Sequence, residues 1–164
     1  MASITEETTN EVYALTGVAL HWAQCFEASM TNFLILHARL TGTVTTLESS
    51  DKLEAEYEKS TMGQLAKKLR QFAVFDDDAE EILKSAIQER NRLMHRFFQI
   101  HAETFLSENG AKGMLKELQN CTILFRKADL IARTMGIAAA KACGVSEDDI
   151  QREYEAMNAN AKNG

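Results

Sequence analysis

The sequence predicts an all-α fold in which four to five amphipathic helices form an antiparallel bundle. Three observations support this prediction. The chain of 164 residues contains no proline, the residue that most strongly interrupts helices. Its apolar residues recur at steps of three and four, which is the spacing of one helical face. No segment shows the alternating pattern of a strand. We expect one domain over residues 1–160 and a frayed polar tail at residues 161–164.

The composition limits the class of protein. Hydrophobic residues make up 45% and charged residues 26% of the chain, as in an ordinary globular domain. No apolar run approaches the roughly 18 residues of a membrane span, and the N-terminus lacks the features of a secretory signal. The three cysteines are too widely spaced for a disulfide framework, which favours a reducing, cytoplasmic location. The net charge of −6 argues against a general nucleic-acid coat.

The first half of the chain predicts two helices and a connection between them. Residues 5–40 carry one long apolar stripe that ends before Gly42. Residues 41–59 lack such a stripe, and we expect a surface connection with at most a loose helical turn at its end. The second helix is expected from Thr61 to about Val74, because Thr61 and Gln64 have the spacing of a capping box.

The second half predicts three further helices. A third helix is expected to follow the acidic residues 76–78, which suit a helix N-terminus, and to reach about Ile100. Residues 102–110 should form a turn, and residues 111–142 a long helix. A capping-box pattern at residues 146–149 predicts a short fifth helix that carries Ile150, Tyr154 and Met157.

The third helix contains the segment with the most distinctive chemistry. On a helical wheel Arg90 falls near the middle of a wide apolar arc, where an unpaired guanidinium is unfavourable. His95 lies about 140° further round the helix, one turn after Asn91. Residues 84–101 carry a local charge of +3, which leaves −9 on the rest of the chain. A basic segment in an acidic protein indicates an anionic ligand.

These residue types suit cleavage of RNA without a metal ion or cofactor. Histidine changes its charge near neutral pH, so His95 is a candidate to take the proton from a ribose 2′-hydroxyl. Arg90 is a candidate to hold the phosphate and stabilise its developing charge, and Asn91 to orient either group. Substrate contacts are further predicted for three flanking cations: Lys84, Arg92 and Arg96.

The width of the apolar arc also predicts a homodimer. Part of the arc can face the bundle, while Ile87, Met94 and Phe98 face a second copy of the chain. One straight helix does not direct Arg90 and His95 toward the same atom, whereas a kink or a second copy of the helix across a two-fold axis would do so.

Each of these residues also has a simpler structural interpretation. Arg90 could form a buried ion pair, for example with Glu27 on the first helix. His95 could make one hydrogen bond and have no chemical task. Arg92 and Arg96 fall on the polar side of the wheel, where a solvated charged face is the ordinary outcome.

The order Arg90-Asn91-x-x-x-His95 resembles the signature of the HEPN superfamily, in which an arginine and a polar residue precede a histidine on one helix. Glu89 before the motif and the phenylalanines at residues 97–98 resemble the flanks seen in several HEPN groups. The segment at residues 61–65 resembles a Thr-x-Gly-x-Leu stretch in some of them. The detailed resemblance covers residues 60–100.

The resemblance implies a helical bundle that dimerises around the motif helix. In catalytic members this motif forms a metal-independent endoribonuclease site, which here implies phosphate binding by Arg90, support by Asn91, proton transfer by His95 and products with 2′,3′-cyclic phosphate ends. Such members act as toxins, phage-defence effectors or RNA-processing enzymes. The implied partners are therefore RNA, either tRNA or mRNA, and a cognate antitoxin or regulator. The alternative is a non-catalytic HEPN-like module that binds a nucleotide or another protein.

One other pair of residues has ligand chemistry. His21 and Cys25 are one helical turn apart, a spacing that can hold a metal ion. No second pair has such spacing, and both residues lie on or near the apolar stripe of the first helix. We therefore expect them to pack in the core and expect no metal site.

Overall fold

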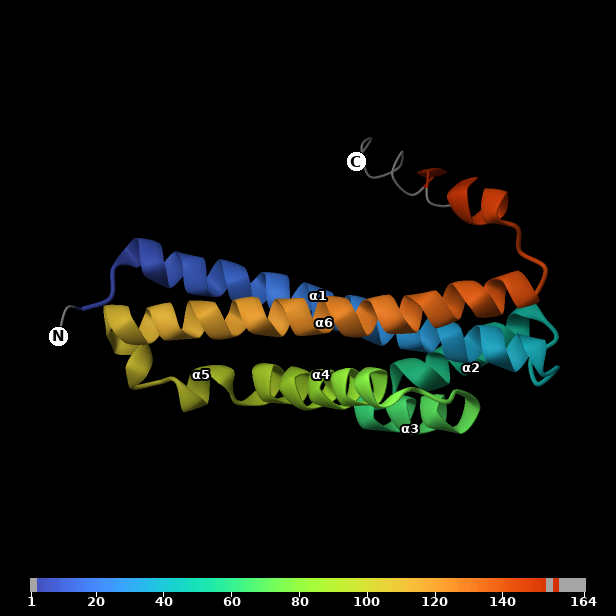
Figure 1. Cartoon of the computed structure of the whole chain (residues 1–164), viewed down its shortest axis with the longest axis horizontal. Helices are drawn as coiled ribbons and strands as arrows, with labels where there is room; N and C mark the ends of the chain where they lie inside the picture. The colour runs from blue at the N-terminus through green and yellow to red at the C-terminus, as the bar shows by residue number, and fades with distance from the viewer. Residues whose placement is uncertain (1–2, 153–154, 157–164) are drawn as a thin grey trace.

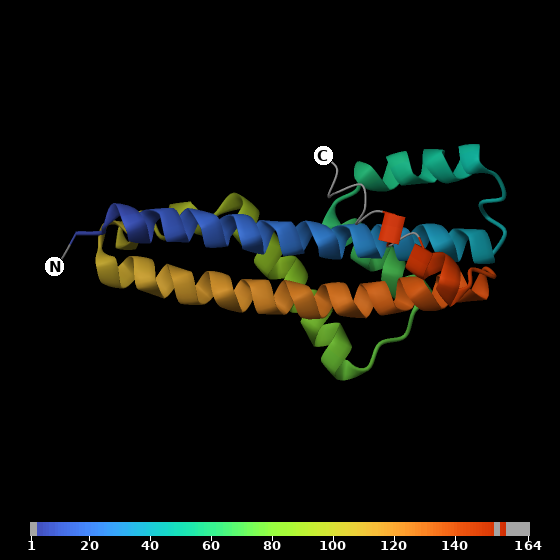
Figure 2. The same ribbon diagram turned by 90° about the horizontal axis from the view of Figure 1, so that it is seen from above.

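Two long helices form the body of the molecule (Figure 1). The computed structural model describes residues 3–152 and 155–156. In this part of the chain the secondary structure is helical and no strand forms. The long helices, 35 residues each, are α1 (Glu6–Leu40) and α6 (Glu108–Ala142). They lie side by side along their lengths and bury most of the core between them (Figure 2).

The two long helices run parallel, which makes the prediction of an antiparallel bundle wrong for this pair. At one end of the pair, Thr8 Oγ1 donates a hydrogen bond to Glu108 Oε1 at 3.1 Å. Near its middle, Ser29 Oγ donates to Asp129 Oδ1 at 2.6 Å. Residue numbers therefore rise together along both helices. The reason is that residues 41–107 lead the chain back along the molecule, so that α6 starts at the same end as α1.

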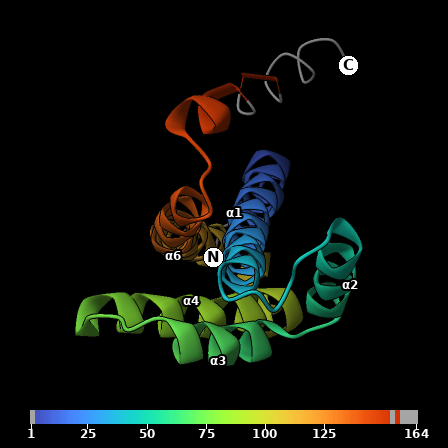
Figure 3. The same ribbon diagram turned by 90° about the vertical axis from the view of Figure 1, so that its right-hand side faces the viewer.

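The return segment consists of shorter helices. The helix α4 crosses beneath both long helices at a slant, from the α6 side to the α1 side, and leads the chain back toward the end where α1 begins (Figures 2 and 3). Its contacts with α1 include the Arg90–Glu27 ion pair, and in α5 the Phe98 ring packs at a tilt against the Tyr13 ring. The short elements, in chain order, are α2 (Leu47–Glu58), α3 (Met62–Phe72), α4 (Asp77–His95), α5 (Phe97–Ile100) and the 3₁₀ turn η1 (Thr104–Leu106).

The helix α2 corrects the expectation of a surface connection at residues 41–59. A capping box starts it: Ser49 N–H donates to Thr46 Oγ1, and Thr46 N–H donates to Ser49 Oγ, both at 3.1 Å. Its buried residues Ser50 and Tyr57 hold it to the body, and Arg39 donates a hydrogen bond to Ser50 at 2.8 Å. Few apolar residues are needed for this attachment, so the sequence shows no long stripe there.

The predicted caps of the later helices are confirmed. Thr61 N–H donates to Gln64 Oε1 at 2.7 Å, and Gln64 N–H donates back to Thr61 Oγ1 at 3.3 Å. Ser146 and Asp149 form the same reciprocal pair, and residues 147–152 are helical. Tyr154, Met157 and the tail at residues 161–164, which also carried predictions, lie outside the described residues.

The third predicted helix ends earlier than expected. It was predicted to reach about Ile100, but α4 ends at His95, because Arg96 leaves the helical region with φ −136° and ψ −12°. The chain then resumes as α5, whose Phe97 is fully buried in the core. The last long helix, predicted from residue 111, begins at Glu108 with Ser107 as its N-cap.

The core between the two long helices is completed by buried residues of α3, α4 and α5. Its largest fully buried side chains include Phe26 of α1, Phe97 of α5 and Phe125 of α6. None of the helices in the described residues is long and apolar enough to cross a membrane.

Candidate functional site

Arg90 faces α1 from the C-terminal half of α4. Its Nη2 donates to Glu27 Oε2 at 3.1 Å, and its Nη1 donates to Asn91 Oδ1 at 3.3 Å. The Arg90 side chain is 22% exposed, so the guanidinium reaches solvent at the edge of the helix contact. The simpler interpretation of Arg90, an ion pair with Glu27, is thus confirmed. The arginine still keeps N–H groups that these two contacts do not use.

His95 lies on the opposite, outward side of α4. It is exposed, it is the last residue of the helix, and it makes no hydrogen bond to a described residue. Asn91, one turn earlier, is exposed as well. Because Arg90 and His95 are about 140° apart on one helix, they point to different sides of it. A single copy of the chain therefore does not bring the three motif residues to one point.

The third arginine of the segment lies in an unexpected place. Arg92 was predicted to lie on the solvated polar side of α4 and to bind substrate. It instead points into the seam between α4 and α6, with 25% of its side chain exposed. Its Nη2 is 2.6 Å from Glu89 Oε2, and its Nη1 is 2.5 Å from Glu117 Oε1. With a carboxylate on each side, Arg92 acts as a structural cation between α4 and α6, and its contact with a substrate stays a prediction.

Arg92 belongs to a polar network that the sequence did not reveal. Glu117 Oε2 lies 2.9 Å from His101 Nε2, within ion-pair distance but poorly aligned for a hydrogen bond, which leaves this buried ring nitrogen without one. The Cys121 thiol donates to Glu89 Oε2 at 3.6 Å. Burial and then the nearby Glu89 charge raise the pKa of this thiol to about 11. The thiol is consequently protonated and unreactive at neutral pH.

The network lines a small open cavity of about 240 Å³ in the seam between α4 and α6. Its two carboxylates, Glu89 and Glu117, face one arginine. No local pattern in the sequence connects these groups, because they come from three elements.

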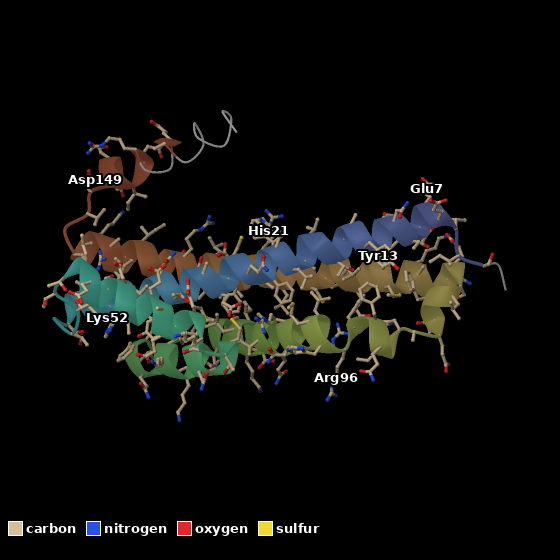
Figure 4. The ribbon with its side chains drawn as sticks, turned by 180° about the vertical axis from the view of Figure 1, so that it is seen from behind. Glu7, Tyr13, His21, Lys52, Arg96 and Asp149 are labelled. Atoms are coloured by element: carbon tan, nitrogen blue, oxygen red, sulfur yellow. The ribbon has the colours of Figure 1, made fainter. Side chains whose placement is uncertain are left out.

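Lys84 and Arg96, the other two cations for which substrate contacts are predicted, are exposed. Lys84 lies seven residues before Asn91 and so on the same outward strip of α4, with only a 3.9 Å approach to Glu81. Arg96 sits at the break between α4 and α5, and Figure 4 shows its side chain pointing away from the two long helices. The outward strip of α4 therefore presents two cations around Asn91 and His95.

An exposed apolar patch adjoins this strip. The rings of Tyr13, Phe98 and Phe105 pack around one another with centroids 5.8–5.9 Å apart. Tyr13 and Phe98 remain exposed, as do Met94 and Ile100 nearby in the sequence. Met94 and Phe98 had been predicted to face a partner. Tyr13 and Phe105 were not foreseen, because an isolated aromatic residue on each of two other elements gives no pattern.

His21 and Cys25 meet on the far side of α1, where Figure 4 shows His21 pointing away from α4. The His21 Nε2 and Cys25 Sγ atoms are 3.6 Å apart. Neither is buried: His21 is exposed, and Cys25 is half-buried with its thiol pKa raised by burial and by Asp129. No group of three or more potential metal ligands forms within residues 3–152 and 155–156.

Comparison of the chain with protein-family models, with curated proteins and with solved structures finds no match in any of the three.

Proposed function

We propose that the protein is a metal-independent endoribonuclease of the HEPN type that acts as a homodimer in the cytoplasm. One observation carries this proposal: His95 is an exposed imidazole without a hydrogen-bond partner in the described chain, beside Asn91 and an uncovered apolar surface. A histidine held in this way is free to exchange a proton with a bound ligand. The exposed cations Lys84 and Arg96 supply the local positive charge for an RNA backbone.

The proposed reaction is an internal transfer at phosphorus. His95 removes the proton from a ribose 2′-hydroxyl, and the 2′-oxygen forms a bond to the adjacent phosphorus. The bond from phosphorus to the 5′-oxygen of the next nucleotide breaks, that oxygen takes a proton from water, and the protonated His95 returns its proton to the solvent. The products are a 2′,3′-cyclic phosphate and a 5′-hydroxyl end. Arg90 stabilises the charge on the phosphoryl oxygens with the N–H groups that Glu27 and Asn91 leave unused.

A second copy of the chain completes the proposed site. Arg90 and His95 point to different sides of the straight α4, so without a bend in this helix the two groups meet across a contact between copies. The patch of Tyr13, Met94 and Phe98 provides apolar surface beside the motif for that contact. The setting that fits such an enzyme is a toxin or phage-defence system in which tRNA or mRNA is the target and a second protein controls the activity.

The test is cleavage in excess EDTA. Wild-type protein and the variant His95→Ala are incubated with total RNA and with a tRNA pool, and the products are resolved on a denaturing gel. A matched control is His21→Ala, because His21 is also exposed but lies on the opposite side of the molecule. We expect discrete fragments with cyclic phosphate ends from wild type and from His21→Ala, and none from His95→Ala. Equal cleavage by all three proteins would overturn the assignment of His95.

The second candidate is a non-catalytic module that binds a nucleotide or another protein through the same surface. The specific observation in its favour is the Arg90–Glu27 ion pair, which already neutralises the arginine. In that case folded, dimeric wild-type protein would leave every RNA class intact, and Arg90 would serve the packing of α4 on α1. Light scattering and circular dichroism on the same sample establish the dimer and the fold.

A further inference from the structure

The outer face of α6 carries a line of exposed aliphatic side chains. Ile123, Leu130 and Ile137 are 53%, 54% and 39% exposed. They are spaced by seven residues, about two helical turns, and therefore follow one another along the helix. The helix α6 lies at a corner of the molecule, with α1 beside it and α4 beneath it (Figures 1 and 3). Exposed apolar residues in regular register indicate a contact surface rather than scattered surface residues.

The charge on this face is of one sign. Each acidic residue of α6 is engaged by another side chain: Glu108 accepts a hydrogen bond from Thr8, Glu117 pairs with Arg92, and Asp129, 4% exposed, accepts a hydrogen bond from Ser29. The exposed charged residues of α6 are all basic, in a chain whose net charge is −6. They are Lys112, Lys116, Arg126, Lys127, Arg133 and Lys141.

The cations nearest the aliphatic line are free to bind a partner. Arg126, Lys127 and Arg133 make no ion pair within the described part of the chain, whereas the outer residues Lys112 and Lys141 pair with Glu108 and Glu147. The Arg126 guanidinium rests over the Trp22 ring, 5.0 Å from its centroid. This contact holds the guanidinium in place beside Ile123 without neutralising it.

A groove opens beside the middle of the line. It has a volume of about 530 Å³ and is mostly apolar. The extended segment between α3 and α4 forms one wall, where Val74 is fully exposed. Leu130 belongs to the other wall. The groove is lined by Ala73, Val74, Phe75, Leu130, Ile131, Thr134 and Met135.

We propose that the face of α6 between Ile123 and Ile137 binds an acidic amphipathic helix of a partner protein. The apolar stripe of that helix lies along the aliphatic line, and its flanking carboxylates meet Arg126, Lys127 and Arg133. One bulky side chain of the partner enters the groove beside Leu130. The proposal does not depend on the ribonuclease reaction, because this face is separate from the outward strip of α4.

Two other occupants fit less well. A nucleic-acid backbone would pair with the cations but would gain nothing from three exposed aliphatic side chains. A second copy that presented the same face across a two-fold axis would place its cations against these cations, which is repulsive. An acidic helix satisfies both features of the face.

The test uses the full chain and a fluorescent synthetic helix of about 20 residues, with leucines in a seven-residue repeat flanked by glutamates. Binding is measured by fluorescence anisotropy. A peptide of the same composition with scattered leucines is the first control. The variants are Leu130→Asp and Lys127→Glu. Their matched controls are Leu47→Asp and Lys67→Glu, since both residues are exposed on other helices.

We expect the patterned helix to bind and the scattered one to bind much more weakly. Leu130→Asp should weaken binding about tenfold, and Lys127→Glu should weaken it severalfold and reduce its dependence on salt. The two controls and His95→Ala should bind like wild type, which separates this result from the fate of the ribonuclease proposal.

Three results would overturn the proposal. One is equal binding of both peptides by all variants. Another is binding of single-stranded RNA that depends on Lys127 but not on Leu130, which would assign the face to phosphate. The third is a change in the molar mass of the protein caused by Leu130→Asp alone, which would make a second copy the occupant.

Discussion

Arg92 and Arg96 lie one helical turn apart but in opposite environments. Arg92 is held between Glu89 and Glu117, whereas Arg96 is exposed. Removing Arg92 leaves two half-buried carboxylates facing each other. We therefore expect Arg92→Ala to lower the free energy of unfolding by about 1–3 kcal/mol, and Arg96→Ala to change it by less than about 0.5 kcal/mol. Urea unfolding followed by circular dichroism measures both. Similar values for the two variants would contradict a structural role for Arg92.

The pKa of about 11 for the Cys121 thiol predicts low reactivity in the folded protein. Alkylation requires the thiolate, so at pH 8 exposed Cys143 should react first and Cys121 last. Peptide mass mapping of the folded protein measures the order, and an unfolded sample, in which all the cysteines should react alike, is the control.

The raised pKa of the Cys121 thiol also has a consequence for the free energy of unfolding. The unfolded thiol ionises first, so this contribution to stability is present below pH 9.0 and is lost as the pH rises toward 11. Early labelling of Cys121 in the folded protein would contradict the raised pKa of its thiol.

Among the elements, the start of α6 depends on a close backbone approach. Gly110 N–H donates to the Ser107 cap at 3.2 Å, and a side chain on Gly110 would overlap the carbonyl group of Thr104. That carbonyl is backbone and cannot turn aside, so Gly110→Ala must displace η1 or the first turn of α6. We expect a loss of about 1–3 kcal/mol in the free energy of unfolding, although alanine favours helices. The matched control is Gly113→Ala, which meets nothing nearby and should stabilise the protein slightly. Equal effects at the two glycines would contradict this account.

The helix boundaries that capping residues mark in the sequence could be predicted, and the other boundaries could not. Thr61 and Ser146 have cap partners three residues later, and both caps form. The end of α4 at His95 has no such signal, because Arg96 is neither glycine nor proline and no side chain caps α5. What accompanies the break is the burial of Phe97, a tertiary contact that a local pattern cannot express.

For the whole molecule, the periodicity of the long helices predicted their existence but not their relative direction. A stripe of apolar residues serves a parallel neighbour as well as an antiparallel one. The direction follows from α4, which fills the return path beneath both long helices (Figure 2). Because α4 contacts both α1 and α6, more of its surface is covered than a helical wheel with one buried face suggests. Arg92 is therefore enclosed between α4 and α6. The pairing of Arg90 with Glu27 could be anticipated, because a cation in an apolar arc requires a carboxylate partner.

The divergence of Arg90 and His95 on α4 leads to a test at the scale of the assembly. If the proposed active site combines Arg90 of one copy with His95 of the other, Arg90→Ala and His95→Ala are each inactive, but a dimer containing one of each has one intact site. Random exchange makes half of the dimers mixed, so the equimolar mixture should recover about a quarter of wild-type ribonuclease activity. The mixture is prepared by dilution and reconcentration, and cleavage is measured in EDTA. Each variant mixed with itself is the control. A mixture as inactive as its components, with exchange verified by mass spectrometry of labelled copies, would show that each site draws both residues from one chain, and α4 would then have to bend at the motif for the two side chains to meet.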